Sequence, residues 1–480
     1  MTTEENCDVV VVGGGIAGLV AAVRAAELGL SVTLLEKGRE ERYACNARMS
    51  GGVFHVAFHD PKTAPGDLLA AINAASGGAA DPVLAKVMAE RAGGLVDWLR
   101  GQGARFIRAG NVAWQNYILA PPRPLRAGID WMGRGPDVLL RQLAAGLQQK
   151  GGRIRLSARG HALIMDAARC VGIDAEIEGK TVHLPARAVV LADGGFQSDT
   201  DLLARHITPA PGKLKQRGGA TGTGDGLRMA QEAGAALTSL DRFYGHLLSR
   251  DAMHSDKVWP YPELDGIATA AIVVDGNGRR FADEGMGGVW LANTIARLSD
   301  PLSATIVFDT RIWNGPGRSA RIPANPSLET AGGTIHTAAT LDALAAMAGL
   351  PADTLAVTVA AYNDAVRAER MELLSPRRSV DRFGPWPVET APFHAIPVCA
   401  GITYTMGGLR IDADARVLRA DGRAIDGLYA AGSTTGGLEG GERAAYLGGL
   451  TKAGVQGLCA AEHIARTLLS DAASKGSHTA

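Results

Sequence analysis

Residues 8–37 read DVVVVGGGIAGLVAAVRAAELGLSVTLLEK, and this stretch decides the fold. An apolar strand runs into the pattern Gly-x-Gly-x-x-Gly, and a helical run, a second strand and an acid follow. Each glycine has a physical role. Gly13 permits a tight turn, Gly15 lets a pyrophosphate approach the backbone, and Gly18 lets helix and strand pack closely. The order predicts a βαβ unit that binds a dinucleotide.

The start of this helix and the end of the second strand supply the polar groups that such a ligand needs. The free N–H groups around Ile16 and Ala17 are expected to point at phosphates. Glu36 stands where a carboxylate accepts hydrogen bonds from a ribose diol, and Lys37 follows it. The alternative is a glycine-rich turn in an ordinary βαβ unit that binds nothing. The strand, the helix and the acid at the expected distance argue against that alternative.

Length and composition bound the class of protein. A chain of 480 residues is too long for one ordinary core, so two domains are expected. The 49 basic and 49 acidic residues cancel. The sequence therefore has no excess of positive charge that would favour binding to nucleic acid or to an anionic membrane. The five cysteines are scattered without a Cys-x-x-Cys pair, and the histidines do not cluster. We therefore expect neither a disulfide framework nor a metal site.

The N-terminal sequence bears on location. Residues 1–6 are acidic and lack a basic region, so we expect no signal peptide. The apolar run from Val9 to Ala26 is interrupted by glycines and by Arg24, which makes it too polar for a membrane span. These observations predict a globular cytoplasmic protein.

The rest of the chain divides into two regions that differ in amino-acid composition. Residues 66–150 are predicted to be mainly helical, residues 161–184 a hairpin, and residues 188–196 a separate buried strand. A helix is expected over 353–370, a strand over 427–432 and a last helix over 447–469. After residue 240 Trp, Tyr, Pro, His and Met become denser. We therefore predict a discontinuous Rossmann-like α/β domain, residues 1–240 and 399–480, with an α+β capping domain inserted at 241–398.

Further motifs follow the opening stretch in a fixed order: Asn46, Ser50-Gly51-Gly52, Ala192-Asp193-Gly194-Gly195-Phe196, Thr221-Gly222-Thr223-Gly224-Asp225-Gly226, Gly278-Arg279-Arg280-Phe281-Ala282-Asp283-Glu284, Thr405-Met406-Gly407-Gly408, Gly427-Leu428-Tyr429-Ala430-Ala431-Gly432 and Leu447-Gly448-Gly449. With this series the chain resembles the FAD-binding dehydrogenases and reductases of the fumarate reductase and succinate dehydrogenase type along nearly its whole length. The series is specific for fold and flavin and much less so for substrate.

The resemblance implies the cofactor and the residues that hold it. These are Gly13, Gly15, Ile16, Ala17, Gly18, Glu36, Lys37, Asn46, Ala47, Ser50, Gly51, Gly52, Gly160, Ala192, Asp193, Gly194, Gly224, Asp225, Gly432, Ser433, Gly449 and Leu450. The start of the last helix would stabilise a reduced flavin through its dipole. Members with covalent FAD carry a histidine in the segment after the first acid; residues 43–50 have none, so non-covalent FAD is expected. No second dinucleotide unit is present, so no NAD(P)H site is expected, and the electron donor or acceptor stays open.

Three positions depart from fumarate reductases. Tyr404 stands where they place a substrate-binding histidine, and Tyr446 where they place an arginine. The proton-delivering arginine expected soon after Glu284 is missing. The tyrosines resemble instead the tricarballylate dehydrogenase-like and 3-ketosteroid dehydrogenase-like members. In the ketosteroid type, the resemblance implies that a tyrosine hydroxyl polarises a ketone.

Four residues are candidates for contact with substrate. Tyr404 and Tyr446 are expected at the flavin edge. His246 either faces substrate or is a polar residue of the cap, and Arg443 either binds a carboxylate or pairs with Glu439 or Glu442. The leading hypothesis is an enzyme that dehydrogenates or reduces a C–C bond α,β to a carbonyl or carboxylate of a small molecule. The alternatives are an oxygen-using amine or amino-acid oxidase of the L-aspartate oxidase type and a non-catalytic flavin-binding electron-transfer subunit.

Overall fold

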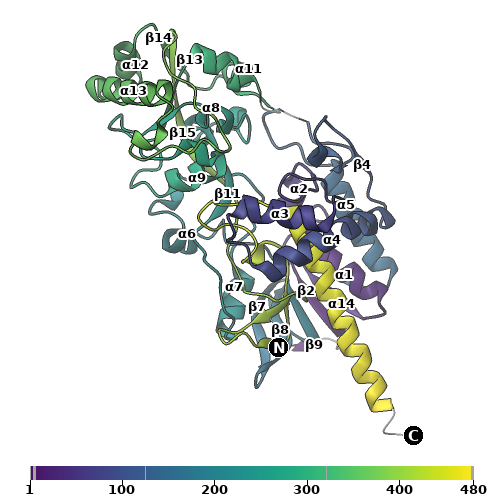
Figure 1. Ribbon diagram of the computed structural model, residues 1–480. Coiled ribbons are helices and arrows are strands. Elements are labelled where there is room, and N and C mark those ends of the chain that lie inside the picture. Colours follow the sequence, from purple (N-terminus) through teal and green to yellow (C-terminus); the bar gives the residue numbers. More distant parts are fainter. Residues whose placement is uncertain (1, 4–6, 125, 320–321, 477–480) are drawn as a thin grey trace.

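The computed structural model describes residues 2–3, 7–124, 126–319 and 322–476. The chain forms two lobes (Figure 1). The first lobe holds the largest sheet and the long helix α14, Gly449–Gly476, and the second holds the smaller sheet and most of the middle of the chain. The α/β architecture predicted from the sequence is confirmed.

The large sheet is parallel in its centre and runs in the order β16-β17-β9-β2-β3-β6. The valine run of β2 is buried throughout, because neighbouring strands and helices cover both of its faces. β7 and β8 extend β9 in antiparallel fashion, and β1 pairs with β9. The strands are β1 Thr2–Thr3, β2 Cys7–Val12, β3 Val32–Leu35, β6 Arg153–Arg155, β7 Ala158–Asp166, β8 Arg169–Ile177, β9 Lys180–Leu191, β16 Arg416–Leu418 and β17 Ala424–Ala430.

Strand β9 corrects one prediction. Residues 181–184 and 188–191, expected in a hairpin and in a separate strand, belong to one continuous strand. Its first half pairs with β8 and its second half with β2 and β17, so the change of partner falls within the strand. Residues 192–196, expected to prolong this strand, form the loop beyond it.

Helices cover the large sheet, and α1 packs along α14 (Figure 1). A Cβ on Gly457 of α14 would lie 2.6 Å from the Ala17 carbonyl oxygen of α1, so the absence of a side chain sets this close approach. The helices of this lobe are α1 Ile16–Glu27, α2 Asn46–Met49, α3 Pro65–Ser76, α4 Pro82–Gly101, α5 Gly135–Gln149, α6 Thr200–His206, α7 Asp225–Glu232 and α14. The prediction of helices over 66–150 is wrong for 102–134, which holds a 3₁₀ turn and the short strands β4 Phe106–Ile107 and β5 Ile118–Leu119.

The second sheet is built around the long strand β15, Phe393–Thr405, which pairs with four other strands. These and the remaining strand are β10 Lys215–Gln216, β11 Phe243–Ser249, β12 Ile272–Val274, β13 Thr305–Asp309 and β14 His336–Ala338. The helices around it are α8 Asp265–Ala268, α9 Gly288–Ala296, α10 Thr310–Asn314, α11 Ala324–Thr330, α12 Leu341–Ala348 and α13 Ala352–Arg367. β15 ends at Thr405 against the large-sheet lobe, so it carries the second sheet to the edge of the site.

Across the described ranges, no helix combines the length and apolar character needed to cross a membrane. All five cysteines lie in the described part of the chain as buried free thiols. In the same part, no three or more His, Cys, Asp or Glu side chains gather in a geometry that could hold a metal ion.

Candidate active site

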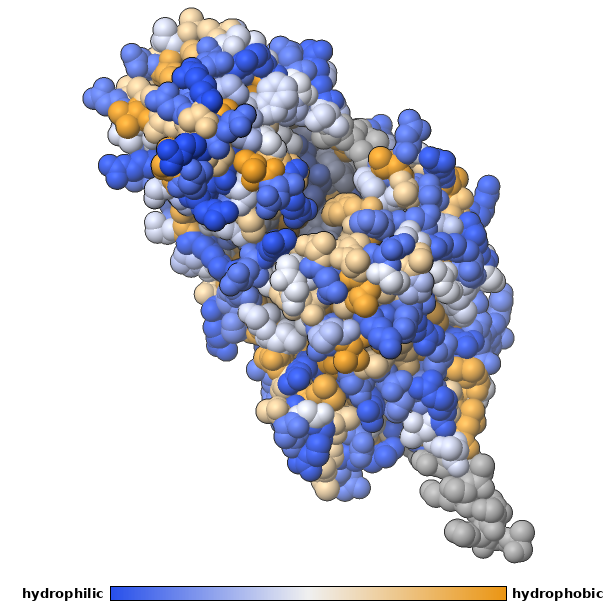
Figure 2. All heavy atoms as spheres, viewed as in Figure 1, coloured by the Kyte–Doolittle hydropathy of each residue, from blue (hydrophilic) through white to orange (hydrophobic). Residues whose placement is uncertain are grey.

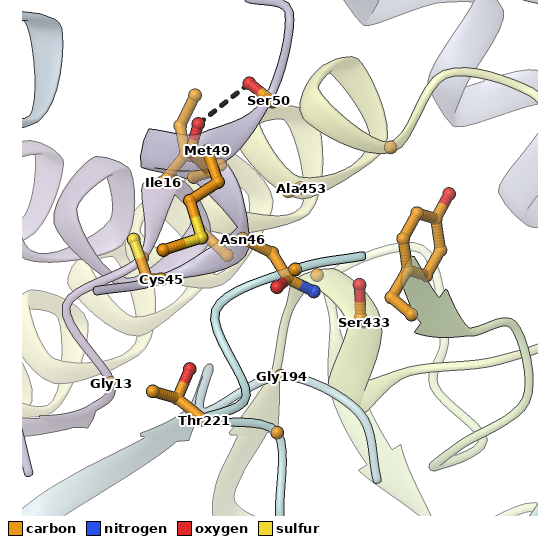
Figure 3. Close-up of a pocket in the computed structure, with 18 of the residues that line it drawn as sticks. Gly13, Ile16, Cys45, Asn46, Met49, Ser50, Gly194, Thr221, Ser433 and Ala453 are labelled. Carbon is orange, nitrogen blue, oxygen red and sulfur yellow. Dashed lines mark hydrogen bonds between the residues drawn. The ribbon is translucent and has the colours of Figure 1, made fainter. Parts of the chain in front are cut away.

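An inner cavity lies at the carboxyl ends of the parallel strands. Its walls come from the turn after β2, from α2, from the loop before α7, from the loop after β17 and from the start of α14. Figure 3 shows Gly13, Asn46, Thr221 and Ser433 of these segments around one space. Segments more than 400 residues apart in sequence therefore meet at one site, as expected where strand order changes in an open parallel sheet.

Two glycines of the opening motif, Gly13 and Gly18, have the turn and packing roles predicted for them. Gly13 has φ +103°, and a Cβ on it would lie 2.5 Å from the Ala192 carbonyl oxygen. A Cβ on Gly18 would lie 1.9 Å from the Gly13 carbonyl oxygen, so helix and strand could not pack as they do. A Cβ on Gly15 would meet no protein atom within 4 Å. Gly15 therefore borders the open space of the cavity.

The charged side chains that follow β3 are held in place by the protein. The Glu36 carboxylate accepts hydrogen bonds from the Gly14 N–H at 2.8 Å and the Gly38 N–H at 2.7 Å. The Lys37 ammonium donates to Thr223 Oγ1 at 2.7 Å and lies 3.2 Å from Asp225 Oδ2. α1 has no side-chain cap at its N-terminus, which leaves its first N–H groups for a ligand.

Asp193 lines the cavity from the loop that leaves β9. It accepts a hydrogen bond from the Gly226 N–H at 2.8 Å. Burial raises the pKa of the Asp193 carboxyl to about 6, although the Gly226 N–H opposes the shift. Gln197 also lines the cavity, and its buried Oε1 has no hydrogen-bond partner. An unpaired buried acceptor and the open space beside Gly15 both fit a polar ligand here.

Most of the predicted cofactor residues line the inner cavity. Gly18, Gly52 and Gly224 do not. Gly18 acts through helix packing, Gly52 lines the neighbouring cleft, and Gly224 forms the left-handed cap of α7 with φ +69°. Asn46 binds protein on both ends of its amide, through Thr403 O at 2.8 Å and the Gly219 N–H at 2.8 Å, so it ties three segments together at the wall.

A second cavity, here called the outer cleft, opens beside the inner one. Its walls come from α3 and the loop before it, from β11, from the loop before α9 and from the loop that precedes α14. Figure 2 shows the surface hollowed between the two lobes. Ser50, Gly51, Tyr244, Tyr261, Glu263, Tyr446 and Leu450 line both cavities.

Three tyrosines form the wall between the cavities. The rings of Tyr244 and Tyr446 stack with centroids 4.0 Å apart, and Tyr404 lies 5.3 Å from Tyr244. Burial raises the pKa of all three hydroxyls, and the Glu439 charge raises the pKa of Tyr404 and Tyr446 further. The three side chains are therefore neutral phenols near neutral pH.

Tyr244 belongs to a chain of hydrogen bonds on β11. Its hydroxyl lies 2.9 Å from His246 Nε2, and His246 Nδ1 lies 2.6 Å from Asp265 Oδ2. A carboxylate oxygen only accepts, so the Asp265 contact assigns a hydrogen to Nδ1 and leaves Nε2 facing the Tyr244 hydroxyl. Asp265 is itself fixed by the Leu247 N–H at 2.8 Å. The arrangement can pass a proton between the tyrosine and the imidazole.

Tyr404 has a different partner. Its hydroxyl donates to the Glu439 carboxylate, whose oxygens both lie 3.0 Å away, and the Lys452 ammonium lies 2.7 Å from the same carboxylate. The Glu439 and Lys452 side chains are almost fully buried. The Tyr404 hydroxyl therefore already donates its hydrogen bond within the protein. Tyr446 is left as the tyrosine of the wall that can donate to a ligand.

Several residues of the wall were not singled out from the sequence. They are Tyr244, Asp265, Glu439 and Lys452, together with Arg217 and Glu263, whose side chains lie 2.6 Å apart. One signal was present for Tyr244: it stands two residues before His246, and on a strand that spacing puts both on one face. The others carry no local signal, because they are brought together from separate loops, strands and helices.

The arrangement of Arg443 answers the question left open for it. It pairs with neither Glu439 nor Glu442 but donates from Nη1 to the Ala74 carbonyl at 3.0 Å, and it lines the outer cleft. His246 lines the same cleft.

The parallel sheet, the glycine turn at its carboxyl end and the acid at the end of β3 define a dinucleotide-binding protein of the Rossmann type. The FAD binding domain family matches residues 8–446, so the chain belongs to this family and its cofactor is FAD. The open space at Gly15, the uncapped start of α1 and the unpaired Gln197 fit that cofactor.

Named relatives cover most of the chain. It is 29% identical to "NADH:acrylate oxidoreductase" of Vibrio harveyi over 92% of its length, and 28% identical to "Probable fumarate reductase Ifc3" of Shewanella frigidimarina over 91%. The chain spans 49% of the first relative and 71% of the second. In fold it is similar to a 3-ketosteroid Δ1-dehydrogenase from Sterolibacterium denitrificans, with a TM-score of 0.71, 22% identity, and coverage of 97% of this chain and all of that one.

Proposed function

We propose that the protein is an FAD-dependent oxidoreductase that forms or reduces a C–C double bond next to a carbonyl or carboxylate of a small molecule. The observation that carries the proposal is the wall between the two cavities, where Tyr446 and Tyr244 line both and Tyr244 is bonded through His246 to Asp265 on the side of the outer cleft. The names of the two relatives, an acrylate oxidoreductase and a fumarate reductase, point to the same kind of bond.

The cavity residues support an assignment of parts. We assign cofactor binding to residues 1–240 and 399–480 and the cap to residues 241–398, which supply Tyr244, His246 and Asp265. The predicted residues of the inner cavity would hold FAD non-covalently, with the pyrophosphate at Gly15 and the flavin near Gly449 and Leu450. When bound, FAD supplies two-electron chemistry by exchanging a hydride equivalent with a substrate carbon.

Tyr446 is the residue placed to bind the carbonyl. Its phenol stays neutral because burial raises its pKa, so it can donate a hydrogen bond to a carbonyl oxygen. That bond strengthens as negative charge develops on the oxygen in the enolate-like transition state. The effect acidifies the neighbouring C–H bond, which is what dehydrogenation requires.

The chain behind Tyr244 supplies the path for the proton. In the direction that forms the double bond, the Tyr244 oxygen takes the proton from the carbon next to the carbonyl while its own proton passes to His246 Nε2. The imidazolium so formed keeps its Nδ1–H bond to the Asp265 carboxylate, which stabilises the new charge. Because burial raises the pKa of Tyr244 well above 10, the two transfers occur together rather than through a free phenolate.

The test is anaerobic reduction of the bound flavin. Purified yellow protein is titrated with cyclic ketones, tricarboxylates and dicarboxylates, and the visible absorbance is followed. We expect at least one carbonyl compound to bleach the flavin.

Two further measurements test the other proposals. Release of yellow flavin on acid precipitation would support non-covalent binding, and fractionation of cells checks the cytoplasmic location.

A pair of variants assigns the chemistry to the wall. Tyr244→Phe should slow bleaching by about 10²-fold or more, the usual contribution of a positioned acid or base. Tyr429→Phe is the matched control, because Tyr429 also bonds a histidine, His463 at 2.9 Å, but lines neither cavity. Hydrogen peroxide formed from an amino acid would favour the oxidase alternative. Bound flavin that no compound bleaches would favour the electron-transfer subunit.

A further inference from the structure

Two guanidinium groups in the outer cleft have no acidic partner. Arg382 and Arg443 both line the cleft, and within the described residues no carboxylate lies within 4.0 Å of either. Two acids in the inner part of the cleft already have partners. Glu263 lies 2.6 Å from Arg217, and Asp265 lies 2.6 Å from His246. The cleft therefore holds unpaired positive charge at one part of its wall.

Arg443 is held in place without losing its charge. It donates from Nη1 to the Ala74 carbonyl in the last turn of α3, and its side chain lies over Gly77, where a Cβ would come within 2.7 Å of Nε. The carbonyl end of a helix attracts a cation, which fixes the position of this guanidinium. Its other N–H groups have no acceptor in the described part of the protein.

Arg382 reaches the same cleft from the other lobe. Its guanidinium lies 5.6 Å from the Phe383 ring, and Phe383 packs against Gly287. Burial and the neighbouring Arg443 charge lower the pKa of Arg382, so the two cations repel each other. An anion between them would relieve the repulsion and accept N–H groups from both.

Another acid of the cleft does not supply that anion. Asp67 is exposed in the first turn of α3, seven residues before Ala74. Seven residues of helix span roughly 10 Å, a distance at which exposed charges are largely screened at physiological salt.

Another part of the cleft wall is aromatic. Phe58 is 47% exposed, and it meets Trp114, His55 and Tyr446 with ring centroids 5.7, 4.9 and 5.9 Å away. Ala57 and Phe58 both have positive φ values, 47° and 62°, which non-glycine residues adopt only when their surroundings hold them there. The chain thus presents an aromatic ring to the cleft beside the tyrosine wall.

We propose that the outer cleft binds substrates with an apolar body and a carboxylate remote from the reacting bond, and that Arg382 and Arg443 bind this carboxylate. The body lies against Phe58 and Trp114, and the reacting carbonyl meets Tyr446. This inference rests on the proposed function for the reacting end and names the substrate class.

Binding and turnover test the two ideas separately. Binding of cyclohexanecarboxylate to the holoprotein is measured by calorimetry in wild type, in the double variant Arg382→Gln/Arg443→Gln and in Arg423→Gln. Arg423 is an exposed arginine outside the cleft. We expect the double variant to bind about tenfold more weakly or worse, the control to match wild type, and wild-type binding to weaken with salt. Equal binding by wild type and double variant would overturn the inference, whatever the outcome of the flavin titrations.

Turnover adds a second readout. Bleaching by 4-oxocyclohexanecarboxylate is compared with bleaching by its methyl ester. We expect wild type to prefer the acid by about tenfold or more in kcat/KM, and the double variant to lose this preference through KM while kcat stays near its value. Equal use of acid and ester by wild type would overturn the inference. Failure of both compounds alone would count against the proposed function, and calorimetry would still decide on the arginines.

Discussion

The inner cavity and the wall between the cavities are built in opposite ways. The inner cavity is lined largely by backbone, by glycines and by charges that short sequence motifs bring together, such as Glu36 with the N–H groups of Gly14 and Gly38. The wall is made of large side chains from β11, β15 and the loop before α14. A motif can hold a cofactor locally, whereas the reaction depends on contacts between distant segments.

The largest expected effect distinguishes the glycine that lets helix and strand pack from the glycine that borders the cavity. Gly18→Ala places a Cβ 1.9 Å from the Gly13 carbonyl oxygen, so we expect loss of bound FAD and of native structure. Gly15→Ala meets no protein atom within 4 Å, so the protein should fold but lose FAD. Circular dichroism and the ratio of flavin to protein absorbance check both. If Gly15→Ala leaves the affinity for FAD intact, the pyrophosphate does not lie against this position.

The next effect distinguishes two tyrosines of the wall. Tyr446→Phe removes the donor to the carbonyl, and we expect kcat to fall by about 10²–10³-fold with flavin retained. Tyr404→Phe removes a hydroxyl whose proton is held by Glu439, so its effect on kcat should be smaller and its effect on thermal stability larger. Steady-state kinetics and thermal melting give the two readouts. The opposite ranking would exchange the roles of the two residues.

A smaller effect concerns the buried ion pair behind the wall. Lys452→Met leaves the fully buried Glu439 carboxylate without its cation, and we expect a loss of about 3–5 kcal/mol of stability. Lys86→Met is the control, since the Lys86–Glu90 pair is largely exposed and should contribute about 1 kcal/mol or less. Melting followed by flavin fluorescence measures both. Equal losses would mean that the buried pair does not support the wall.

The smallest effect is a pH dependence in the inner cavity. The pKa of Asp193 is about 6 in the folded protein against an ordinary value of 3.8. Between these values the folded state keeps a proton that the unfolded state releases, so this group's contribution to stability is lost as the pH rises through about 6. Asp193→Asn should raise the melting temperature by a few degrees at pH 7.5 and have little effect near pH 4. A gain independent of pH would show that the carboxyl charge is not its cause.

The same comparison shows which features short sequence motifs predict and which they miss. The fold class, the glycine roles and the cofactor follow from the stretch around Gly13 and from motifs that each occupy a few residues. The continuous strand β9 was divided wrongly, because its two halves have different partners and only the sheet joins them. Residues 102–134 were predicted helical, but β4 and β5 pair there, and the Leu119 N–H of β5 donates to the Gly52 carbonyl, a long-range contact that no local pattern shows.

The sequence by itself determined the dinucleotide-binding unit, because strand, turn, helix and acid act within forty residues and their spacing fixes their geometry. The later motifs carried the resemblance that implied FAD. The sequence also placed Tyr404, Tyr446 and His246 among the candidates through short motifs. Only the tertiary structure decided that Asp265 stands behind His246, that Glu439 holds the proton of Tyr404, and that Arg382 and Arg443 meet in one cleft. Those contacts join residues up to 61 positions apart, and such pairings depend on how the two sheets and the long helix pack rather than on any local pattern.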